Sequence, residues 1–469
     1  MSASILWFRN DLRLADNHTL QAAMATGAVL PLYILDEHLG GASRWWLHHS
    51  LAALGKDLAA RGARLILRRG DPLEIIPTLA RETGASHVHA ARAFEPALRN
   101  IDRALASILR TENIGFHRHL STALFAPEQI VTKSGGPYGV YTPFAKACFA
   151  AGVPGIPAPA PAQINGLAAA SDDLESWRLC PHKPDWAGGL RASWRPGEAG
   201  ARAQLQEFLA NSIESYDSKR DFPGISATSR LSPHVRFGEI SPRALWQSAA
   251  MAGNGNGVHV FLKELLWREF SLHLLWHHPT LRQEPLRAEF AAFPWNETKG
   301  HLAAWQRGRT GVPIIDAGMR ELWQTGWMHN RVRMICASYL VKHLLIPWQA
   351  GEAWFWDCLC DADEAANGAS WQWVAGCGAD AAPYFRIFNP VLQGRKFDPD
   401  GAYIRRFVPE LAKLPLAVLH APWEADSALL AAAGVRLGAS YPHPLITPEA
   451  GRARALAAYS QMKEEATKG

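Results

Sequence analysis

The first part of the chain, about 130 residues long, alternates between two hydrophobic patterns. Short apolar runs rich in β-branched and aromatic residues recur and predict strands. They occupy residues 5–8, 29–35, 64–68, 87–90 and 115–119. Between them lie Ala- and Leu-rich stretches with helical period, such as 45–62 and 96–109. This alternation predicts βαβ units, and therefore a Rossmann-like parallel sheet with helices on both faces.

A dinucleotide fingerprint does not follow the first predicted strand. The pattern G-x-G-x-x-G would place a pyrophosphate at a helix N-terminus. The chain instead continues as RNDLRLADN over residues 9–17. The sheet domain therefore need not hold NAD or FAD.

The remaining chain divides into a connector and a helical region. Residues from about 131 to 200 include AGVPGIPAPAPAQING (151–166), a composition typical of surface loops. From residue 201 onward, apolar stripes near helical period recur at 201–213, 259–276, 312–326 and 331–345. We expect an α/β domain over 1–130, a linker over 131–200 and a larger all-α domain over 201–469.

Composition limits the class of protein. A chain of 469 residues favours two domains. The net charge of +5 and the pI of 8.9 permit an anionic partner without requiring one. No apolar run reaches membrane-spanning length, and the N-terminus lacks a signal-peptide layout. The six cysteines are scattered without a CxxC pair or zinc spacing, so we expect a reduced, cytoplasmic protein.

Tryptophan is the outlier in the composition, with 19 residues. A buried indole needs a partner for its N–H group, so this number suggests that ring faces have a use of their own. Trp295, Trp348 and Trp371 stand alone in different helical stretches, where core packing is the ordinary explanation.

Two helical stretches carry candidate chemistry. In KELLWREF (263–270), Glu264 and Arg268 share one helix face with Trp267 beside them. This is either a surface ion pair or a cleft face with an acceptor, a cation and an aromatic plate. In TGWMHNRVRMI (325–335), a helix opens at Asn330, which is an ordinary capping residue.

Two further segments leave alternatives open. The hydroxyls near 228–232 form either an anion cradle or a turn with a helix cap. In DADEAAN (361–367), the EF-hand pattern fails because Ala365 stands at position five and position six is not glycine. We therefore expect no metal site there, and Asp361 is better explained as a partner for an arginine.

Taken together and in order, these segments resemble the photolyase/cryptochrome family. The resemblance rests on WFRNDLRLADN (7–17), KELLWREF, TGWMHNRVRMI, DADEAAN and WQWVAGCGADAAPYFRIFNP (371–390), and it runs nearly end to end. The segments GGASRWWLHHSLAAL (40–54) and TKSGGPYGVYTPF (132–144) look most like bacterial cyclobutane-dimer photolyases of class III. The resemblance implies an α/β domain, a long connecting loop and a helical domain that holds FAD in a U-shaped form.

The resemblance also implies a flavin pocket. The phosphate-binding stretch corresponds to Tyr216, Thr228, Ser229, Arg230, Leu231 and Ser232. Arg268 and Asp361 match charged residues beside the flavin, and Asp363 matches the residue at the isoalloxazine edge. Asn367 matches the position facing flavin N5, where Asn accompanies repair enzymes and cryptochromes tend to carry Asp or Cys. The group at this position biases which flavin redox state persists.

The same resemblance implies a DNA-damage site. Trp267 and Trp373 match the aromatic plates that hold the damaged bases, and Glu264 and Asn330 match residues that hydrogen-bond the pyrimidines. Met334 matches a position that is Met in cyclobutane-dimer enzymes, whereas animal six-four enzymes carry His at the positions of Asn330 and Met334. The tryptophans Trp371, Trp348 and Trp295 match the electron relay to FAD. Phosphate contacts are expected from Arg331, Arg386 and Arg406, with Arg395 and Lys396 as further candidates.

The implied function is light-driven repair of cyclobutane pyrimidine dimers in UV-damaged DNA, by electron transfer from photoexcited reduced FAD. The alternative is a cryptochrome-type blue-light receptor without repair activity. Ala97 and Leu98 replace the Asn-Glu pair of one folate-binding antenna subtype. We still expect methenyltetrahydrofolate as the antenna, with 8-hydroxydeazaflavin as the alternative. The protein is expected to act as a monomer without membrane attachment.

Overall fold

The structure is a computed structural model that describes residues 3–153, 155–296, 298–381 and 386–468. The chain forms two compact units, each assembled from separate stretches. Unit 1 comprises Met1–Asp217, Thr228–Pro279 and Cys360–Ala365. Unit 2 comprises Ser218–Ala227, Thr280–Leu359 and Ala366–Gly469. The domain boundaries near residues 130 and 200 remain a prediction from composition.

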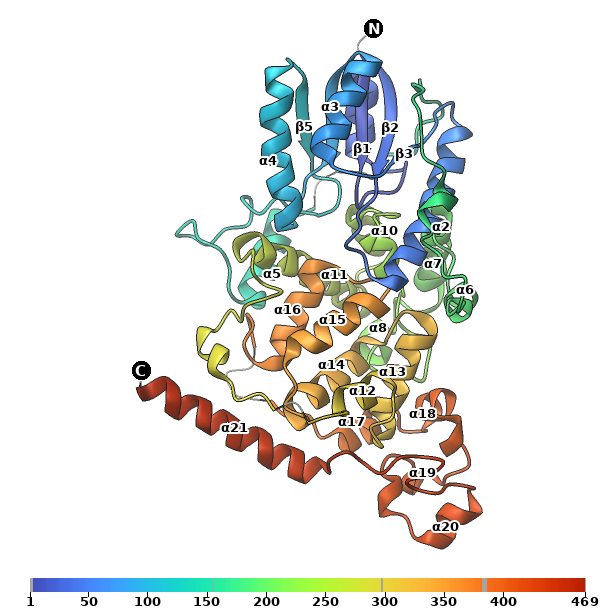
Figure 1. Cartoon of the computed structure of the whole chain (residues 1–469), viewed down its shortest axis with the longest axis vertical. Coiled ribbons are helices and arrows are strands. Elements are labelled where there is room, and N and C mark those ends of the chain that lie inside the picture. Colours follow the sequence, from blue (N-terminus) through green and yellow to red (C-terminus); the bar gives the residue numbers. More distant parts are fainter. Residues whose placement is uncertain (1–2, 154, 297, 382–385, 469) are drawn as a thin grey trace. The chain divides into compact units, whose positions relative to one another are not determined.

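Unit 1 contains a five-stranded parallel sheet with strand order β3-β2-β1-β4-β5 (Figure 1). The strands are β1 (Ala3–Phe8), β2 (Ala28–Ile34), β3 (Ile66–Arg68), β4 (Ala85–Ala91) and β5 (Gly115–His119). Every predicted strand is found, although β3 is shorter than its apolar run. The prediction of an N-terminal α/β domain built on a parallel sheet is therefore confirmed.

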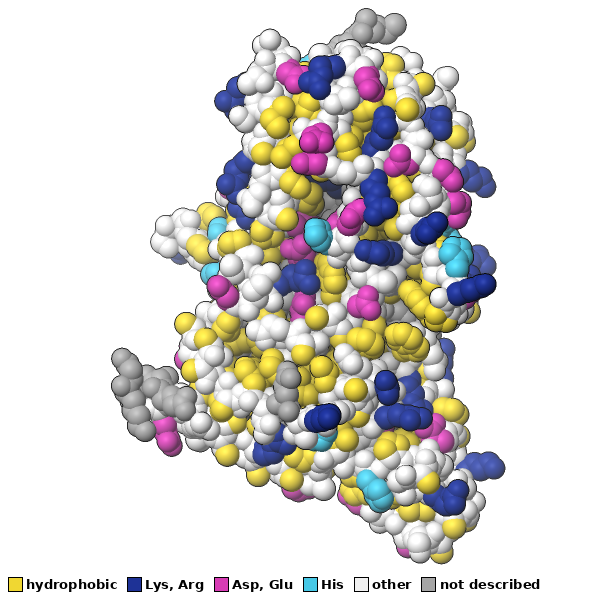
Figure 2. Space-filling model, viewed as in Figure 1, with side chains coloured by type: hydrophobic (Ala, Val, Ile, Leu, Met, Phe, Trp, Pro, Cys, Tyr) yellow, Lys and Arg dark blue, Asp and Glu magenta, His cyan; other side chains and the backbone are white. Residues whose placement is uncertain are grey.

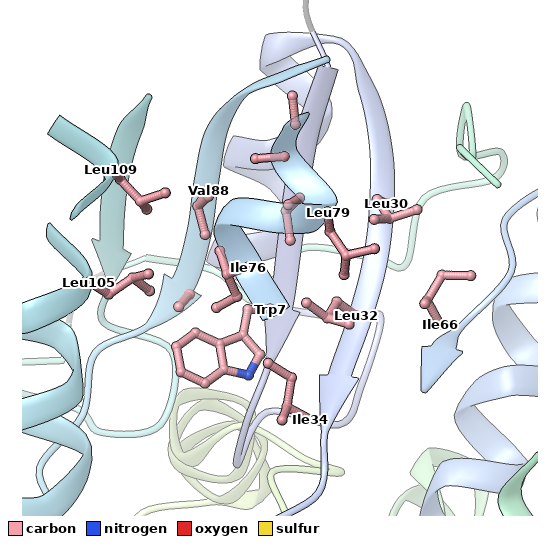
Figure 3. Close-up of a cluster of buried hydrophobic side chains, with 14 of the residues drawn as sticks. Trp7, Leu30, Leu32, Ile34, Ile66, Ile76, Leu79, Val88, Leu105 and Leu109 are labelled. Carbon is pink, nitrogen blue, oxygen red and sulfur yellow. The ribbon is translucent and has the colours of Figure 1, made fainter. Parts of the chain in front are cut away.

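The central strands of the sheet are buried on both faces, as expected for parallel strands, whereas the edge strand β5 is partly exposed. All six residues of β1 are buried. On one face, Trp7 and Leu32 belong to a cluster that includes Ile76 of α3 (Pro72–Thr83) and Leu105 of α4 (Pro96–Thr111) (Figure 3). Helix α1 (His18–Thr26) packs on β1, β2 and β4 without joining this cluster, so it covers the opposite face.

The other helices of unit 1 are α2 (Gly41–Ala59), α5 (Tyr141–Ala151), α6 (Gly188–Ser193), α7 (Glu198–Asn211), α9 (Ser232–Arg236), α10 (Pro242–Ala252) and α11 (Asn256–His277). Of these, α2 connects β2 to β3 and the rest follow the last strand. Helix α5 lies inside the predicted linker, where the apolar pattern did not indicate a helix. Helix α11 extends the predicted stretch 259–276 by a few residues at its start and one at its end. Helix α8 (Tyr216–Lys219) lies at the boundary between the units.

Unit 2 is helical, as the periodic stretches predicted. Its helices include α12 (His301–Gln306), α13 (Pro313–Thr325), α14 (Asn330–Ser338), α15 (Trp348–Cys358), α17 (Pro390–Phe397), α18 (Ala402–Phe407), α19 (Leu416–Leu419), α20 (Ser427–Ala432) and α21 (Pro448–Lys468). The predicted helix over 331–345 is wrong in detail, because α14 ends at Ser338 and a π-helix continues over Tyr339–His343. Helix α16 (Glu364–Ala375) begins in the last stretch of unit 1 and continues into unit 2.

Charges on the visible surface are mixed in sign. Figure 2 shows Lys and Arg side chains dispersed among Asp and Glu side chains, without one large patch of a single sign. Within the described ranges, no helix is long and apolar enough to cross a membrane.

Candidate functional site

The predicted phosphate-binding residues lie in unit 1, with Tyr216 at the start of α8 and the others between Thr228 and Ser232. Tyr216 is buried and packs edge-on against Phe208 and Phe261, with ring centroids 5.4 and 5.6 Å apart. Arg230 has a left-handed φ of +50° and places its guanidinium 4.5 Å from the Trp194 ring. This conformation turns the chain between Ser229 and Leu231.

The residues of this stretch differ in burial. Thr228 and Ser229 are half-buried, and Ser232 is exposed at the first residue of α9. Leu231, in contrast, is buried. Within the stretch, the Ser229 hydroxyl accepts the Leu231 N–H at 3.5 Å.

Two predicted flavin-side residues come together in one pocket of unit 1. Arg268 and Asp363 both line it, together with Arg236 and the Asn10 side chain. Arg268 uses one terminal nitrogen to donate to the Thr122 carbonyl at 2.8 Å. Its Nε is buried and has no hydrogen-bond partner among the described residues. A buried donor without a partner costs free energy, so this nitrogen suits a polar ligand in the pocket.

A buried carboxylate behind Arg268 fixes the wall of this pocket. Glu269 accepts hydrogen bonds from the backbone N–H groups of Leu124 and Phe125, at 2.9 and 3.2 Å. Burial raises the pKa of Glu269 to about 7, while the Arg268 guanidinium 3.4 Å away opposes that rise. The contact ties the loop that contains Thr122 to α11. These hydrogen bonds therefore hold the loop in position beside Arg268.

In unit 2, Asn367 is held from one side. Its amide nitrogen donates to the Glu352 carboxylate at 2.8 Å and to the Glu352 carbonyl at 3.1 Å. Arg282 donates to the same carboxylate through two nitrogens, at 2.7 and 3.3 Å. Because an amide has one donor end and one acceptor end, the Asn367 oxygen points away from Glu352. Asn367 is thus set to present an acceptor.

The three predicted relay tryptophans lie in unit 2 and differ in burial. Trp371 and Trp348 are both 2% exposed, whereas Trp295 is only half-buried. Trp371 packs edge-on against Phe355 and Trp305, with ring centroids 5.0 and 6.2 Å away. Two of the three indoles are therefore buried in the unit and one is partly exposed to solvent.

Trp371 and Trp373, both on α16, differ in burial. Trp371 is buried and Trp373 is half-buried, as expected for positions about 200° apart on a helix. Between them, Gln372 is fully buried. Its amide nitrogen donates to the carbonyls of Leu281 and Glu284 at 2.6 and 2.7 Å. Its amide oxygen accepts the Leu286 N–H at 2.8 Å.

The N-terminus of α14 carries the predicted pyrimidine contacts. The cap is His329, whose Nδ1 accepts the Arg331 N–H at 3.2 Å. The expectation that Asn330 caps this helix is therefore wrong, and Asn330 is exposed in the first turn. Met334 is half-buried one turn later, with its sulfur 3.9 Å from an Arg331 nitrogen.

The arginines predicted to contact phosphate differ in exposure and in ion pairing. Arg331 pairs with Asp221 at 2.8 Å and lies 4.5 Å from the Phe397 ring. Arg386 and Arg406 are exposed. Lys342 donates to the Arg386 backbone carbonyl, which holds the segment that carries this arginine. Arg386 and Arg406 are thus better placed than Arg331 to meet an anionic partner.

Comparisons with known proteins agree with this layout. The family model described as "DNA photolyase" matches residues 4–162, and that described as "FAD binding domain of DNA photolyase" matches residues 261–461. A deoxyribodipyrimidine photo-lyase of Agrobacterium fabrum is 49% identical, with 98% of each chain covered. The chain belongs to the photolyase/cryptochrome family.

Solved structures in the photolyase/cryptochrome family have the same fold. A bacterial class III photolyase from Agrobacterium tumefaciens matches with a TM-score of 0.96 and 48% identity, over 99% of this chain and 98% of that one. Cryptochrome-1 of Arabidopsis thaliana is 35% identical over 98% of this chain and 70% of its own length. The chain thus has the photolyase fold, with an α/β domain and a helical domain of the FAD-binding type.

Several residues beside the predicted photolyase-type site had no signal in the sequence. Glu352 and Arg282 orient Asn367 from other helices and turns, and Gln372 anchors the backbone between the two tryptophans. Glu269 follows Arg268 directly, but only its buried contacts distinguish it from a surface acid. Among the described residues, no group of three or more His, Cys, Asp or Glu side chains is placed to hold a metal ion.

Proposed function

We propose that this chain is a deoxyribodipyrimidine photolyase, which uses blue light to split cyclobutane pyrimidine dimers by electron transfer from reduced FAD. The observation that carries the proposal is the 49% identity over 98% of both chains to a protein of that activity. Identity to the plant cryptochrome is lower, at 35%. Asn367, rather than Asp or Cys, also favours repair over the alternative of a blue-light receptor.

The flavin fits the residues that the structure describes. When bound, FAD supplies light absorption and one-electron chemistry. The unpartnered Arg268 Nε supplies a buried donor, and the Asn367 oxygen supplies an acceptor held by Glu352. The phosphates would be held by Thr228, Ser229 and Ser232 with Arg230 and Tyr216 nearby. The isoalloxazine contacts would come from Arg268, Asp361, Asp363 and Asn367.

The damaged bases would be held by aromatic plates and hydrogen-bonding groups. Trp267 and Trp373 are half-buried, so each retains ring surface on which a flipped base can stack. Glu264 is half-buried and Asn330 is exposed, so both can reach pyrimidine edges. Flipping costs a few kcal/mol and least at a damaged site, which contributes selectivity.

Electron supply to the flavin would use the tryptophan series. Trp371, Trp348 and Trp295 pass from buried to half-buried positions, which supports a path from the cofactor toward solvent. A chain of π-systems moves an electron without moving atoms. This proposed use explains why indole rings occur where aliphatic side chains would pack equally well.

Partner and compartment follow from charge and cysteine chemistry. DNA phosphates would be met by Arg386 and Arg406, with Arg331 contributing if its pair with Asp221 opens. All six cysteines are free, which supports the cytoplasmic location predicted from the sequence. We propose that the protein acts as a monomer on UV-damaged DNA.

The antenna is proposed to be methenyltetrahydrofolate, with 8-hydroxydeazaflavin as the alternative. Leu98 is apolar where one folate-binding subtype has a carboxylate. Folate would therefore be held by contacts other than that acidic pair. The absorption spectrum of freshly purified protein distinguishes the two chromophores.

One experiment tests the proposed activity. The purified protein is reduced and illuminated with blue light over DNA that carries thymine cyclobutane dimers, and the recovery of thymine absorbance is followed. We expect recovery that depends on light. Parallel DNA with six-four photoproducts should show none. A complete lack of recovery on dimer DNA would refute the photolyase proposal and favour the receptor.

A further inference from the structure

In unit 1, the rings of Tyr141 and Trp267 stack with nearly parallel planes. Their ring centroids are 3.6 Å apart and their planes differ by 7°. Tyr141 is the first residue of α5 and is 7% exposed, whereas Trp267 is half-buried in the middle of α11. Ring quadrupoles by themselves favour an offset or edge-on arrangement. The surrounding packing therefore holds these two rings face to face.

A hydrogen bond adds a second constraint. The Tyr141 hydroxyl donates to the Lys263 carbonyl at 2.8 Å. In an α-helix, the carbonyl of residue 263 is also the acceptor for the N–H of residue 267. The hydroxyl thus binds the peptide group to which the backbone of Trp267 is itself bonded. Ring and hydroxyl together fix both the side chain and the helical turn.

Phe270 closes the remaining edge of this arrangement. It packs edge-on against both Tyr141 and Trp267, with ring centroids 6.0 Å away in each case. Tilting of the Trp267 ring would therefore disturb two neighbours. Because Tyr141 covers one face of the indole, a base can stack only on the other face.

The segment before Tyr141 is also fastened to α11. The backbone N–H of Tyr138 donates to Nε2 of His273 at 3.0 Å. The Tyr138 ring packs edge-on against Phe144 of α5, with centroids 6.0 Å apart. Residues 138–144 therefore form a support along α11, although their composition predicts a linker.

We propose that Tyr141 is a positioning residue for recognition of the damaged bases. It holds the Trp267 plate at one tilt before DNA binds, so that little ordering remains to be done on binding. This inference rests on the proposed function, because it assumes that Trp267 stacks on a flipped base. Tyr141 touches the plate and not the substrate, so its effect should appear in discrimination between damaged and undamaged DNA.

The test compares Tyr141→Leu, which removes the ring, with Tyr141→Phe, which removes only the hydroxyl. The matched control is Phe149→Leu, because Phe149 lies in the last turn of α5 and stacks on His259 in the first turn of α11. Affinity is measured for dimer-containing and undamaged DNA of the same sequence. Flavin content and melting temperature are measured for every variant.

We expect Tyr141→Leu to reduce the ratio of the two affinities about 3- to 10-fold, the range that an aromatic pair accounts for. Binding of undamaged DNA and flavin content should stay at wild-type values. The affinity ratio of Tyr141→Phe should be within about 2-fold of the wild-type ratio, since the ring stack remains. Phe149→Leu should leave the ratio unchanged. Wild-type discrimination by a folded Tyr141→Leu protein would overturn the proposal.

A double-variant cycle separates this inference from the proposed function. In a Trp267→Leu background, Tyr141→Leu should cause no further loss of discrimination, because the supported plate is gone. An equal loss in both backgrounds would overturn the positioning role. If Tyr141→Leu does not fold, Tyr141→Met in the same cycle provides the answer. Wild-type discrimination by Trp267→Leu alone would instead contradict the role of Trp267 as a plate.

Discussion

The amide nitrogen of Asn367 and the carboxylate of Glu352 lie 2.8 Å apart. Glu352 also receives two hydrogen bonds from Arg282, whose guanidinium lies 3.9 Å from the Trp356 ring. The orientation of the amide is therefore decided by an ion pair on other helices and turns. The residue at the proposed N5 position cannot be understood from Asn367 alone.

Replacement of Glu352 by Ala should destabilise the protein and release Asn367. Loss of the acceptor leaves buried donors unsatisfied, which costs about 1–3 kcal/mol in the free energy of unfolding. Reduced flavin should then reoxidise several-fold faster in air, as measured by return of the oxidised absorption band. Glu352→Gln keeps an acceptor oxygen, so its reoxidation rate should lie between those of the wild type and Glu352→Ala. The control Glu410→Gln breaks another arginine pair, with Arg320, and should leave reoxidation unchanged.

Replacement of Trp371 by Phe should separate electron supply from repair. Photoreduction of oxidised flavin should slow by an order of magnitude or more, whereas repair by chemically pre-reduced enzyme should stay close to wild type. Flash absorption and thymine recovery measure the two steps. Trp177→Phe removes an indole that packs on Tyr33 in the α/β part of unit 1 and should change neither. Loss of both activities in Trp371→Phe would contradict the relay assignment.

Gly351 permits close approach of α15 to Trp371. A Cβ atom at this position would lie 2.2 Å from Cη2 of Trp371 and 2.6 Å from Cδ2 of Leu340. Gly351→Ala should therefore lower the free energy of unfolding by about 1–3 kcal/mol and also slow photoreduction. Gly188→Ala, in a helix where the nearest atom is 3.9 Å away, should be neutral or slightly stabilising. Chemical denaturation of both variants tests the steric argument.

DNA binding should depend on salt through the exposed arginines. Arg386→Gln and Arg406→Gln should each weaken binding of damaged and undamaged DNA alike. Each should also reduce the slope of log K against log salt by roughly 0.9, the value for one phosphate contact. The exposed Arg110 of α4 provides a control, because Arg110→Gln removes the same charge elsewhere. An unchanged slope for Arg386→Gln would remove it from the phosphate contacts.

A ladder of histidines at the β4–β5 edge should make unit 1 sensitive to acid. His89 is 3% exposed and its Nδ1 lies 3.0 Å from Nε2 of His119, while His87 and His117 make a second pair at 3.0 Å. Burial first, and then the neighbouring imidazoles, lower the pKa of His89 from 6.5 to about 4. The unfolded chain therefore binds this proton more readily than the folded one.

The contribution of neutral His89 to the free energy of unfolding should be fully present above pH 6.5. It should decrease as the pH falls toward 4. The loss for this group is on the order of 3 kcal/mol. Urea unfolding at pH 8, 6 and 5 measures it. His89→Gln should flatten the dependence, and His182→Gln, at an exposed position, should not. A wild-type protein equally stable at pH 8 and pH 5 would contradict this account.

Local pattern predicted the sheet well because its central strands are buried on both faces. The continuous apolar runs around Trp7 and Leu32 are typical of parallel strands, whereas β5 lies at the edge and is partly exposed. The same reasoning missed α5, because Tyr141 and its neighbours follow a Gly- and Pro-rich stretch that reads as a loop. It also extended α14 beyond Ser338, since the following π-helix over Tyr339–His343 is itself helical and all five of its residues are buried.

The residues of the candidate site could be predicted from the sequence only because they lie in recognisable motifs. The resemblance identified Asn367, Trp371 and Trp373, but the apolar pattern did not predict that α16 carries all three. Their orienting partners come from distant parts of the chain, as Glu352 does for Asn367. Such partners have no fixed spacing, so a buried carboxylate like that of Glu269 cannot be told from a surface acid in one sequence.

The anchoring of Gln372 has a consequence for which sequence changes α16 can accept. Its side chain bonds to three backbone groups of residues 281–286, so it fixes the rotation of α16 about its own axis. Inserting or deleting one residue beside it would turn the following side chains by 100° and exchange buried for exposed positions. The helix can therefore acquire new chemistry at Trp371 or Trp373 by substitution, but it does not tolerate a change in length.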